Sequence, residues 1–146
     1  MEVNYSNSEE ETLRIGQAIG KRLQPPRVVL LYGELGSGKT LFTRGLASGL
    51  GVDDPTAVRS PSFTLVNEYP TKSGPLYHID LYRLESQRDL DSIGLEEILS
   101  SRSIVIVEWA EKLLLQPEDA LVVTISVDLD TGTRRLQIGE SDSLTD

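Results

Sequence analysis

The sequence contains no cysteine, so disulfide bonds and thiolate metal sites are excluded. Long apolar runs are missing as well, since none approaches the roughly 18 residues that a membrane-spanning helix requires. The N-terminal residues are rich in Asn, Ser and Glu and do not follow the basic-then-apolar pattern of a secretion signal. We therefore expect a cytoplasmic protein that does not contact a membrane.

Basic residues are also scarce. The chain has 14 Lys and Arg against 23 Asp and Glu, which gives a formal net charge of −9. A protein that binds nucleic acid unaided needs a basic patch to offset the phosphate charge, and no basic cluster occurs in the sequence. Any nucleic acid would therefore be held by a partner. The acidity fits either simple solubility or an acidic face that docks on a partner protein.

The remaining composition is that of a folded globule. Hydrophobic residues make up 38% of the 146 residues and charged residues 25%, and this length suits one domain with a modest core. We find no internal repeat and no low-complexity linker, so we expect residues 1–146 to form a single domain. The final stretch, 140–146, is polar and is expected to be frayed.

Periodicity along the chain predicts alternating strands and helices. Ser8 and Glu11 form a capping-box pattern at the start of a first helix, which Pro25-Pro26 ends. The expected strands cover residues 28–32, 62–69, 75–82, 103–109, 121–128 and 134–138, and the expected helices cover 39–49 and, broken near Gly94, 86–100. This order predicts an α/β fold of the P-loop NTPase type. Its central sheet would be mostly parallel, with flanking helices and antiparallel hairpins at the edges.

A glycine-rich loop follows the first buried strand and matches G-x-x-x-x-G-K-[ST] at every position. Glycines let successive backbone N–H groups point into one concavity, and the following helix adds its free N–H groups and the positive end of its dipole. Lys39 can reach the β- and γ-phosphates of a nucleotide, and the Thr40 hydroxyl can bind Mg²⁺. The predicted nucleotide-binding residues are Gly33, Glu34, Leu35, Gly36, Ser37, Gly38, Lys39, Thr40 and Leu41.

Two acidic residues are candidates for the metal shell and for catalysis. Glu108 ends the buried strand at 103–109, where a P-loop site usually has a carboxylate near the metal. It could bind Mg²⁺ directly, hold a metal-bound water or polarise the attacking water. Asp80 could join the metal shell or orient water, because strand alternation places it on one face with His78 and Tyr82. His78 is the only histidine, and we assign it no catalytic role.

Taken together, these segments resemble the TsaE (YjeE) family of bacterial P-loop ATPases. The shared motifs run in the family order through nearly the whole chain: Thr12-Leu13 with Gly16, the loop 33–40, Ser60–Val66, Tyr77-His78, Asp80–Leu84, Gly94-Leu95 and Val107–Trp109. The resemblance implies a minimal P-loop domain that uses ATP and Mg²⁺. It also implies a role in making threonylcarbamoyladenosine beside the tRNA anticodon. The protein would dock on the TsaD–TsaB pair and meet tRNA only through that complex.

The resemblance also assigns roles to single residues. Lys39 would bind phosphate, Thr40 and Glu108 would hold Mg²⁺, and Asp80 would be a catalytic or metal-shell acid. A switch-like loop sensing the γ-phosphate would include Ser60, Pro61, Ser62 and Thr64, and Trp109 would be a functional aromatic. Adenine would be contacted near Ser8 and by Thr133 or Arg134. Ser62 departs from the Thr common in relatives but keeps a hydroxyl.

Two other classes of function stay open from the residues alone. One is a small-molecule P-loop kinase, which needs an acceptor pocket and an arginine-bearing lid; we find no Arg-rich lid segment, and the 51–62 connection is short. The other is a nucleotide-gated adaptor with little turnover, which differs from a partner-activated ATPase in rate more than in residues. Weak intrinsic ATPase activity is expected in either of the non-kinase cases.

Overall fold

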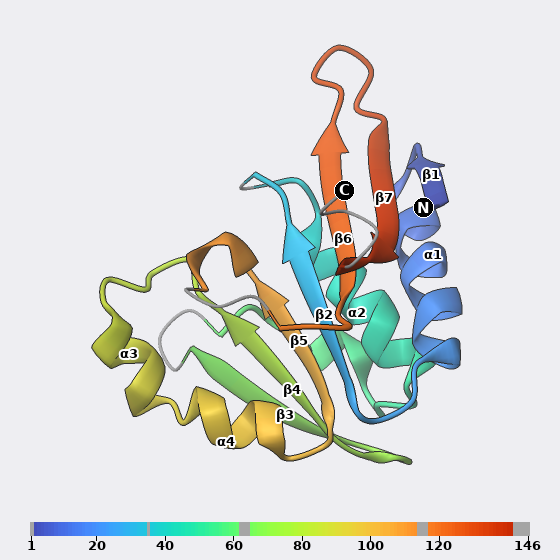
Figure 1. Cartoon of the computed structure of the whole chain (residues 1–146). Helices are drawn as coiled ribbons and strands as arrows, with labels where there is room; N and C mark the ends of the chain where they lie inside the picture. Colours follow the sequence, from blue (N-terminus) through green and yellow to red (C-terminus); the bar gives the residue numbers. More distant parts are fainter. Residues whose placement is uncertain (1, 35, 62–64, 114–116, 142–146) are drawn as a thin grey trace.

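The computed structural model describes residues 2–34, 36–61, 65–113 and 117–141. A seven-stranded sheet in the order β1-β7-β6-β2-β5-β4-β3 forms its centre (Figure 1). The elements in chain order are β1 (Glu2–Ser6), α1 (Glu9–Arg22), β2 (Arg27–Tyr32), α2 (Lys39–Gly49), the 3-10 turn η1 (Pro55–Ala57), β3 (Val66–Thr71), β4 (Gly74–Asp80), α3 (Gln87–Ser92), α4 (Leu95–Ser100), β5 (Ile104–Glu108), the 3-10 turn η2 (Ala110–Lys112), β6 (Leu121–Val127) and β7 (Arg134–Glu140).

The sheet has a parallel centre and antiparallel edges. Strands β4, β5, β2 and β6 run parallel to one another, β3 is antiparallel to β4, and β7 is antiparallel to β6. The predicted α/β architecture is therefore confirmed. Strand β1 was not predicted: it pairs antiparallel with β7, with Val3 opposite Gln137. Val3 and Tyr5 alternate with polar residues, which is a strand pattern, but the segment is only five residues long.

Helices cover both faces of the sheet. In Figure 1, α1 and α2 lie on one side and α3 and α4 on the other. Leu31 of β2 belongs to the core cluster that also contains Phe42 and Leu46 of α2, whereas Leu30 belongs to the cluster that contains Leu90 of α3. Because both faces are buried, β2 reads as a continuous apolar run rather than an alternating one.

Glycines form the contact between α1 and α2. A Cβ atom added at Gly20 would lie 2.3 Å from the carbonyl oxygen of Leu46, and one added at Gly49 would lie 2.3 Å from that of Gln17. Gly16 and Gly45 approach each other in the same way one turn away. Residues four apart share a helix face, so these glycines line one seam and let the two backbones meet. The seam fixes α1 against the helix that carries Lys39 and Thr40.

The first helix starts as the capping pattern predicts. The Ser8 hydroxyl accepts a hydrogen bond from the Glu11 N–H at 3.1 Å. The Glu11 carboxylate accepts from the Asn7 N–H at 2.9 Å, one residue earlier than in a standard capping box. The helical segment expected at 86–100, with its break near Gly94, is confirmed as two helices, α3 and α4, separated at Gly94, which has φ 73°.

Several predicted boundaries were wrong. Strand β4 ends at Asp80 rather than Tyr82, because the Asp80 carboxylate accepts a hydrogen bond from the Tyr82 N–H at 2.9 Å and turns the chain there. The 51–62 loop contains the 3-10 turn η1. Glu140, the first residue of the stretch expected to fray, lies in β7 opposite Leu121; residues 142–146 lie outside the described part. Within the described residues, no helix is both long and apolar enough to span a bilayer.

Candidate functional site

The glycine-rich loop lies between β2 and α2, as the motif predicts. Gly33, Gly36 and Gly38 have φ of 154°, 81° and 106°. At Gly33 a Cβ would also lie 2.6 Å from the Ser37 hydroxyl and 2.7 Å from the Ile125 carbonyl oxygen. Gly38 is the N-cap of α2, in the left-handed region that favours glycine. The predicted contact Leu35 lies outside the described residues.

Lys39 points back over this loop. Its Nζ donates a hydrogen bond to the Gly33 carbonyl oxygen and lies 3.7 Å from the centroid of the Trp109 ring. The side chain is buried, and this burial lowers the pKa of the ammonium below its ordinary value, although Glu108 and other nearby carboxylates oppose the shift. A phosphate bound beside this ammonium would stabilise its charged form, which burial disfavours.

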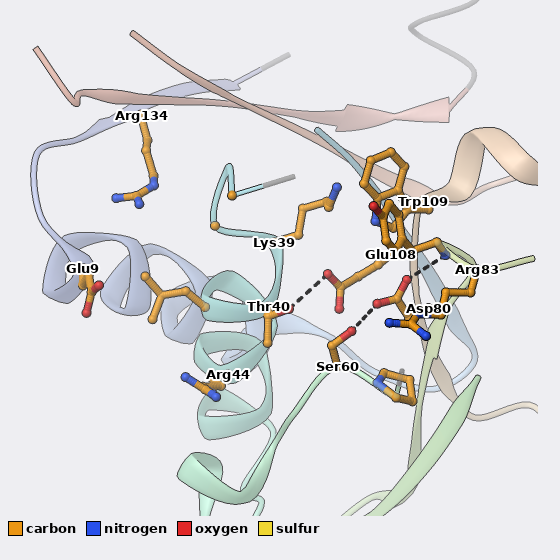
Figure 2. Close-up of a pocket in the computed structure, with 15 residues that line it drawn as sticks. Glu9, Lys39, Thr40, Arg44, Ser60, Asp80, Arg83, Glu108, Trp109 and Arg134 are labelled. Carbon is orange, nitrogen blue, oxygen red and sulfur yellow. Dashed lines mark hydrogen bonds between the residues drawn. The ribbon is translucent and has the colours of Figure 1, made fainter. Parts of the chain in front are cut away.

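The two candidate carboxylates lie side by side at the carboxyl ends of adjacent parallel strands. Asp80 of β4 is opposite Glu108 of β5, and both are buried. The Thr40 hydroxyl donates to Glu108 Oε1 at 3.3 Å, while the Ser60 hydroxyl hydrogen-bonds Asp80 Oδ2 (Figure 2). These two hydrogen bonds connect α2 to Glu108 and the 60–61 segment to Asp80, and the strand pairing brings both connections to one place.

His78 contacts Glu108 directly, a feature that sequence reasoning missed. The imidazole is fully buried, and its Nε2 hydrogen-bonds Glu108 Oε2. The signal available in the sequence was alternation: His78 and Asp80 share one face of β4, and Asp80 is opposite Glu108. The contact itself depends on how β4 pairs with β5, which is not encoded locally.

Two aromatic rings form one wall beside Lys39. Trp109 and Tyr82 have ring centroids 5.0 Å apart, and their planes are tilted by 39°. Trp109 has φ 58° and ψ 44°, in the left-handed region that costs a bulky residue energy. Strained residues of this kind cluster at functional sites. Trp109 follows Glu108 in the sequence, and the backbone turn at Trp109 places its ring beside the Lys39 ammonium.

These groups line one open pocket of volume ≈ 510 Å³, a size common for small-molecule sites. Three arginines from separate elements also line it, Arg44, Arg83 and Arg134 (Figure 2). The Arg134 guanidinium donates to the Ser37 carbonyl oxygen at 3.0 Å, and Arg44 donates to that of Val58 at 2.8 Å. Arg44 and Arg83 were not predicted to line the site. They are far apart in the sequence and do not form a contiguous arginine-rich segment, so only the fold brings them together.

The structure brings together most, but not all, of the predicted site residues. The pocket lining contains the following of them: Gly36, Gly38, Lys39, Thr40, Leu41, Ser60, Pro61, Asp80, Glu108, Trp109 and Arg134. Ser37 is buried beneath the loop and Glu34 is exposed. Ser8 caps α1, and the Thr133 hydroxyl donates to Asn7 Oδ1 at 2.7 Å, so their described contacts lie outside the pocket. Ser62 and Thr64 lie outside the described residues.

The donor set fits Mg²⁺ held jointly by protein and substrate. Thr40 and Glu108 supply hard oxygen donors within one hydrogen bond of each other, and Asp80 is opposite Glu108 on the next strand. Among the described residues no group of three or more His, Cys, Asp or Glu side chains could hold a metal alone. Mg²⁺ is usually bound by one or two protein oxygens together with substrate phosphates and water, as this arrangement allows.

Comparisons with known proteins relate the whole chain to one family. The chain is 41% identical to the "tRNA threonylcarbamoyladenosine biosynthesis protein TsaE" of Nostoc sp., over 89% of this chain and 80% of that protein. It is 42% identical to the protein of that name from Aquifex aeolicus, over 90% of each. The crystal structure of Bacillus subtilis YdiB superposes with a TM-score of 0.69 at 31% identity, covering 94% of this chain and 83% of that one. The model of the family "Threonylcarbamoyl adenosine biosynthesis protein TsaE" matches residues 6–136, and the chain therefore belongs to the TsaE family.

Proposed function

We propose that this chain is an ATPase that acts in threonylcarbamoyladenosine synthesis on tRNA and works on the TsaD–TsaB complex. The names of its relatives supply the pathway. The single observation that carries the chemistry is the hydrogen bond from Thr40 to Glu108, 3.3 Å long, at the mouth of the glycine-rich loop. This contact brings a loop hydroxyl and a strand-end carboxylate to one point, where a P-loop site holds its metal.

The proposed roles follow from the position of each side chain. Lys39 would exchange its bond to the Gly33 carbonyl for the β- and γ-phosphates, and Thr40 and Glu108 would hold Mg²⁺. Bound Mg²⁺ would neutralise the charge that builds on the phosphate oxygens. Asp80 would orient a water for attack on the γ-phosphorus. The bond from phosphorus to the β–γ bridging oxygen then breaks, giving ADP and phosphate.

The segment around Ser60 offers a route from the nucleotide to a partner. Ser60 hydrogen-bonds Asp80 and lines the pocket, and Pro61 beside it is buried against the same site. A γ-phosphate that accepts a hydrogen bond from the Ser60 hydroxyl, or an attacking water held by Asp80, would disturb this bond. We expect the segment to report the state of the nucleotide, and we expect slow hydrolysis until TsaD and TsaB stabilise one arrangement.

The charge of the chain supports indirect contact with tRNA. A net charge of −9 disfavours direct binding to a polyanion, so the TsaD–TsaB pair would hold the tRNA. We propose that the reaction takes place in the cytoplasm and that residues 1–146 form one domain. The adenine would lie toward Arg134, with Ser8 and Thr133 as further predicted contacts.

Phosphate release tests the proposal. The wild-type chain should hydrolyse ATP slowly alone and faster with TsaD and TsaB, and Lys39→Ala should remove the stimulated rate. Lys21→Ala is a matched control, because Lys21 is an exposed lysine of α1 outside the pocket. Unchanged stimulation in Lys39→Ala would refute the assignment of catalysis to the loop. A phosphorylated metabolite in place of free phosphate would favour the kinase alternative.

A further inference from the structure

We propose that His78 is a positioning residue that holds the Glu108 carboxylate in the orientation needed to bind Mg²⁺. The proposal rests on the function proposed above, in which Glu108 is a metal ligand. It concerns a residue that touches neither the nucleotide loop nor the pocket: His78 is fully buried in the sheet and does not line the cavity. Its effect must therefore pass through Glu108.

Both oxygens of Glu108 have a hydrogen-bond partner from a different element. Oε1 accepts from Thr40 of α2 at 3.3 Å, and Oε2 is bonded to His78 Nε2 of β4. A glutamate side chain has three rotatable bonds, and ordering it costs conformational entropy. One contact on each oxygen restricts the carboxylate in advance, so that metal binding need not order the side chain. Such outer contacts typically change metal affinity about 10–100-fold.

The strand register makes the contact with His78 possible. His78 is opposite Ile106, two residues before Glu108, and lies on the same face of the sheet as Asp80. Along this face β4 changes from Leu76 to His78 to Asp80, and β5 changes from Ile104 to Ile106 to Glu108. On this face of β4, His78 therefore immediately precedes Asp80, the residue opposite Glu108. From this position the imidazole reaches the Glu108 carboxylate on the neighbouring strand.

The second ring nitrogen indicates which tautomer makes the contact. Nδ1 is buried and has no hydrogen-bond partner among the described residues. A neutral ring with its proton on Nε2 leaves only a nitrogen acceptor unpaired, whereas the opposite tautomer would bury an unpaired N–H and place two acceptors face to face. The ring thus donates from Nε2 to the carboxylate.

A single-histidine chain allows a direct spectroscopic test. In the nucleotide-free protein labelled with ¹⁵N-histidine, one ring should appear, with a protonated Nε2 and an unprotonated Nδ1. Glu108→Ala should shift the Nε2 and Nε2–H signals, while Thr12→Val, which removes a buried hydroxyl that contacts Ser6 and Ser8 rather than Glu108, should not. An Nδ1–H tautomer, or a signal indifferent to Glu108→Ala, would overturn the contact.

Nucleotide affinity then separates positioning from packing. The probe is a non-hydrolysable ATP analogue titrated by calorimetry in Mg²⁺ and in EDTA. His78→Leu should lower the Mg²⁺-dependent gain in affinity about tenfold and leave the EDTA affinity unchanged. His78→Gln, which can place an amide N–H near Nε2, should restore most of that gain. A gain equal to wild type in His78→Leu would overturn the proposal, as would a gain equally low in both variants.

Glu108→Gln distinguishes failure of this proposal from failure of the proposed function. If Glu108→Gln loses the Mg²⁺-dependent gain while folded His78→Leu keeps it, His78 has no positioning role and the metal site stands. If Glu108→Gln keeps the gain, the metal assignment of Glu108 fails, and the role of His78 fails with it. Should His78→Leu not fold, the spectrum of the wild-type ring and the affinity of His78→Gln still decide: a gain reduced tenfold in folded His78→Gln would contradict the rescue.

Discussion

The seam between α1 and α2 and the cluster at the ends of β4 and β5 achieve close contact in opposite ways. In the seam, glycines remove side chains so that two helix backbones touch. In the cluster, buried polar groups meet one another: His78 and Thr40 contact Glu108, and Ser60 contacts Asp80. The seam therefore depends on backbone packing without side chains, and the cluster depends on hydrogen bonds between polar side chains.

This difference separates what stabilises the fold from what the site is for. Close packing of backbone against backbone gains dispersion energy and buries apolar surface at little desolvation cost. Buried carboxylates are costly to desolvate and are weak evidence of a stabilising role. Substitutions in the seam should therefore lower stability and spare the chemistry, whereas isosteric substitutions in the cluster should do the reverse.

Glu108→Gln should give the largest effect. The change keeps the shape of the side chain but removes the charge that would bind Mg²⁺, a contribution of several kcal/mol in metal-assisted reactions. We expect the rate of Mg²⁺-dependent phosphate release with TsaD and TsaB to fall about 100-fold or more, with the free energy of unfolding within about 1 kcal/mol of wild type. A normal rate would remove Glu108 from the site, and an unfolded variant would assign the cluster a structural role.

Gly20→Ala should affect stability alone. The new methyl group would lie 2.3 Å from the Leu46 carbonyl oxygen, which forces the helices apart. We expect a loss of about 2 kcal/mol in the free energy of unfolding, measured by urea denaturation, since overpacking outweighs the gain in helix propensity.

The matched control for Gly20→Ala is Ala18→Leu, which adds bulk on the exposed face of the same helix. It should change stability by less than about 0.5 kcal/mol. Both variants should keep partner-stimulated turnover at temperatures where they are folded. A large loss of turnover in folded Gly20→Ala would show that the seam also sets the chemistry.

Ser60→Ala should have an intermediate effect on the cluster. The substitution removes the hydroxyl that holds Asp80 and leaves the bond from the Tyr82 N–H in place. Loss of one such bond is worth about 1 kcal/mol, so we expect turnover to fall about fivefold. Ser60→Thr, which keeps the hydroxyl, should retain more activity than Ser60→Ala. Equal rates in the two variants would show that the bond to Asp80 does not matter.

The smallest effect concerns Lys39 and pH. Burial lowers the pKa of this ammonium below 10.5, so the folded state binds its proton less tightly than the unfolded state. Below the lowered pKa the wild-type protein therefore carries the full cost of the buried charge, and Lys39→Met should be the more stable protein. As the pH rises through that pKa toward 10.5 the cost disappears, and the two stabilities should converge. A difference that does not change with pH in urea titrations would contradict the burial effect.

Local patterns explain which parts of this structure could be predicted. The loop 33–40 is a contiguous motif, and the runs of β2 and β5 are apolar on both faces. The phosphate-binding loop and the two buried strands could therefore be predicted from the sequence alone. Glu108 could be proposed because it ends such a run, and Asp80 because strand alternation places it on one face with His78 and Tyr82. Their neighbourhood also follows a general rule, since the carboxyl ends of parallel strands meet at one edge.

Features that depend on long-range pairing could not be predicted. The contact of His78 with Glu108 requires the exact strand neighbours and register of β4 and β5, which periodicity does not contain. The pairing of β1 with β7 joins residues 2–6 to 134–138, and Arg134 contacts Ser37 across 97 positions of sequence. A glycine inside one helix carries no sign of its partner, and the seam forms only when the two helices pack face to face.

Multiple-turnover threonylcarbamoylation of tRNA is the most direct measurement of the proposed role. TsaD, TsaB, tRNA and a supply of the activated threonylcarbamoyl donor would be combined with this chain and ATP, and the modified nucleoside would be counted against TsaD. The product should exceed the amount of TsaD only when the wild-type chain and hydrolysable ATP are both present. Glu108→Gln should stop at about one round, and Gly20→Ala should continue. Repeated turnover without the chain, or with folded Glu108→Gln in its place, would contradict a hydrolytic role for the cluster.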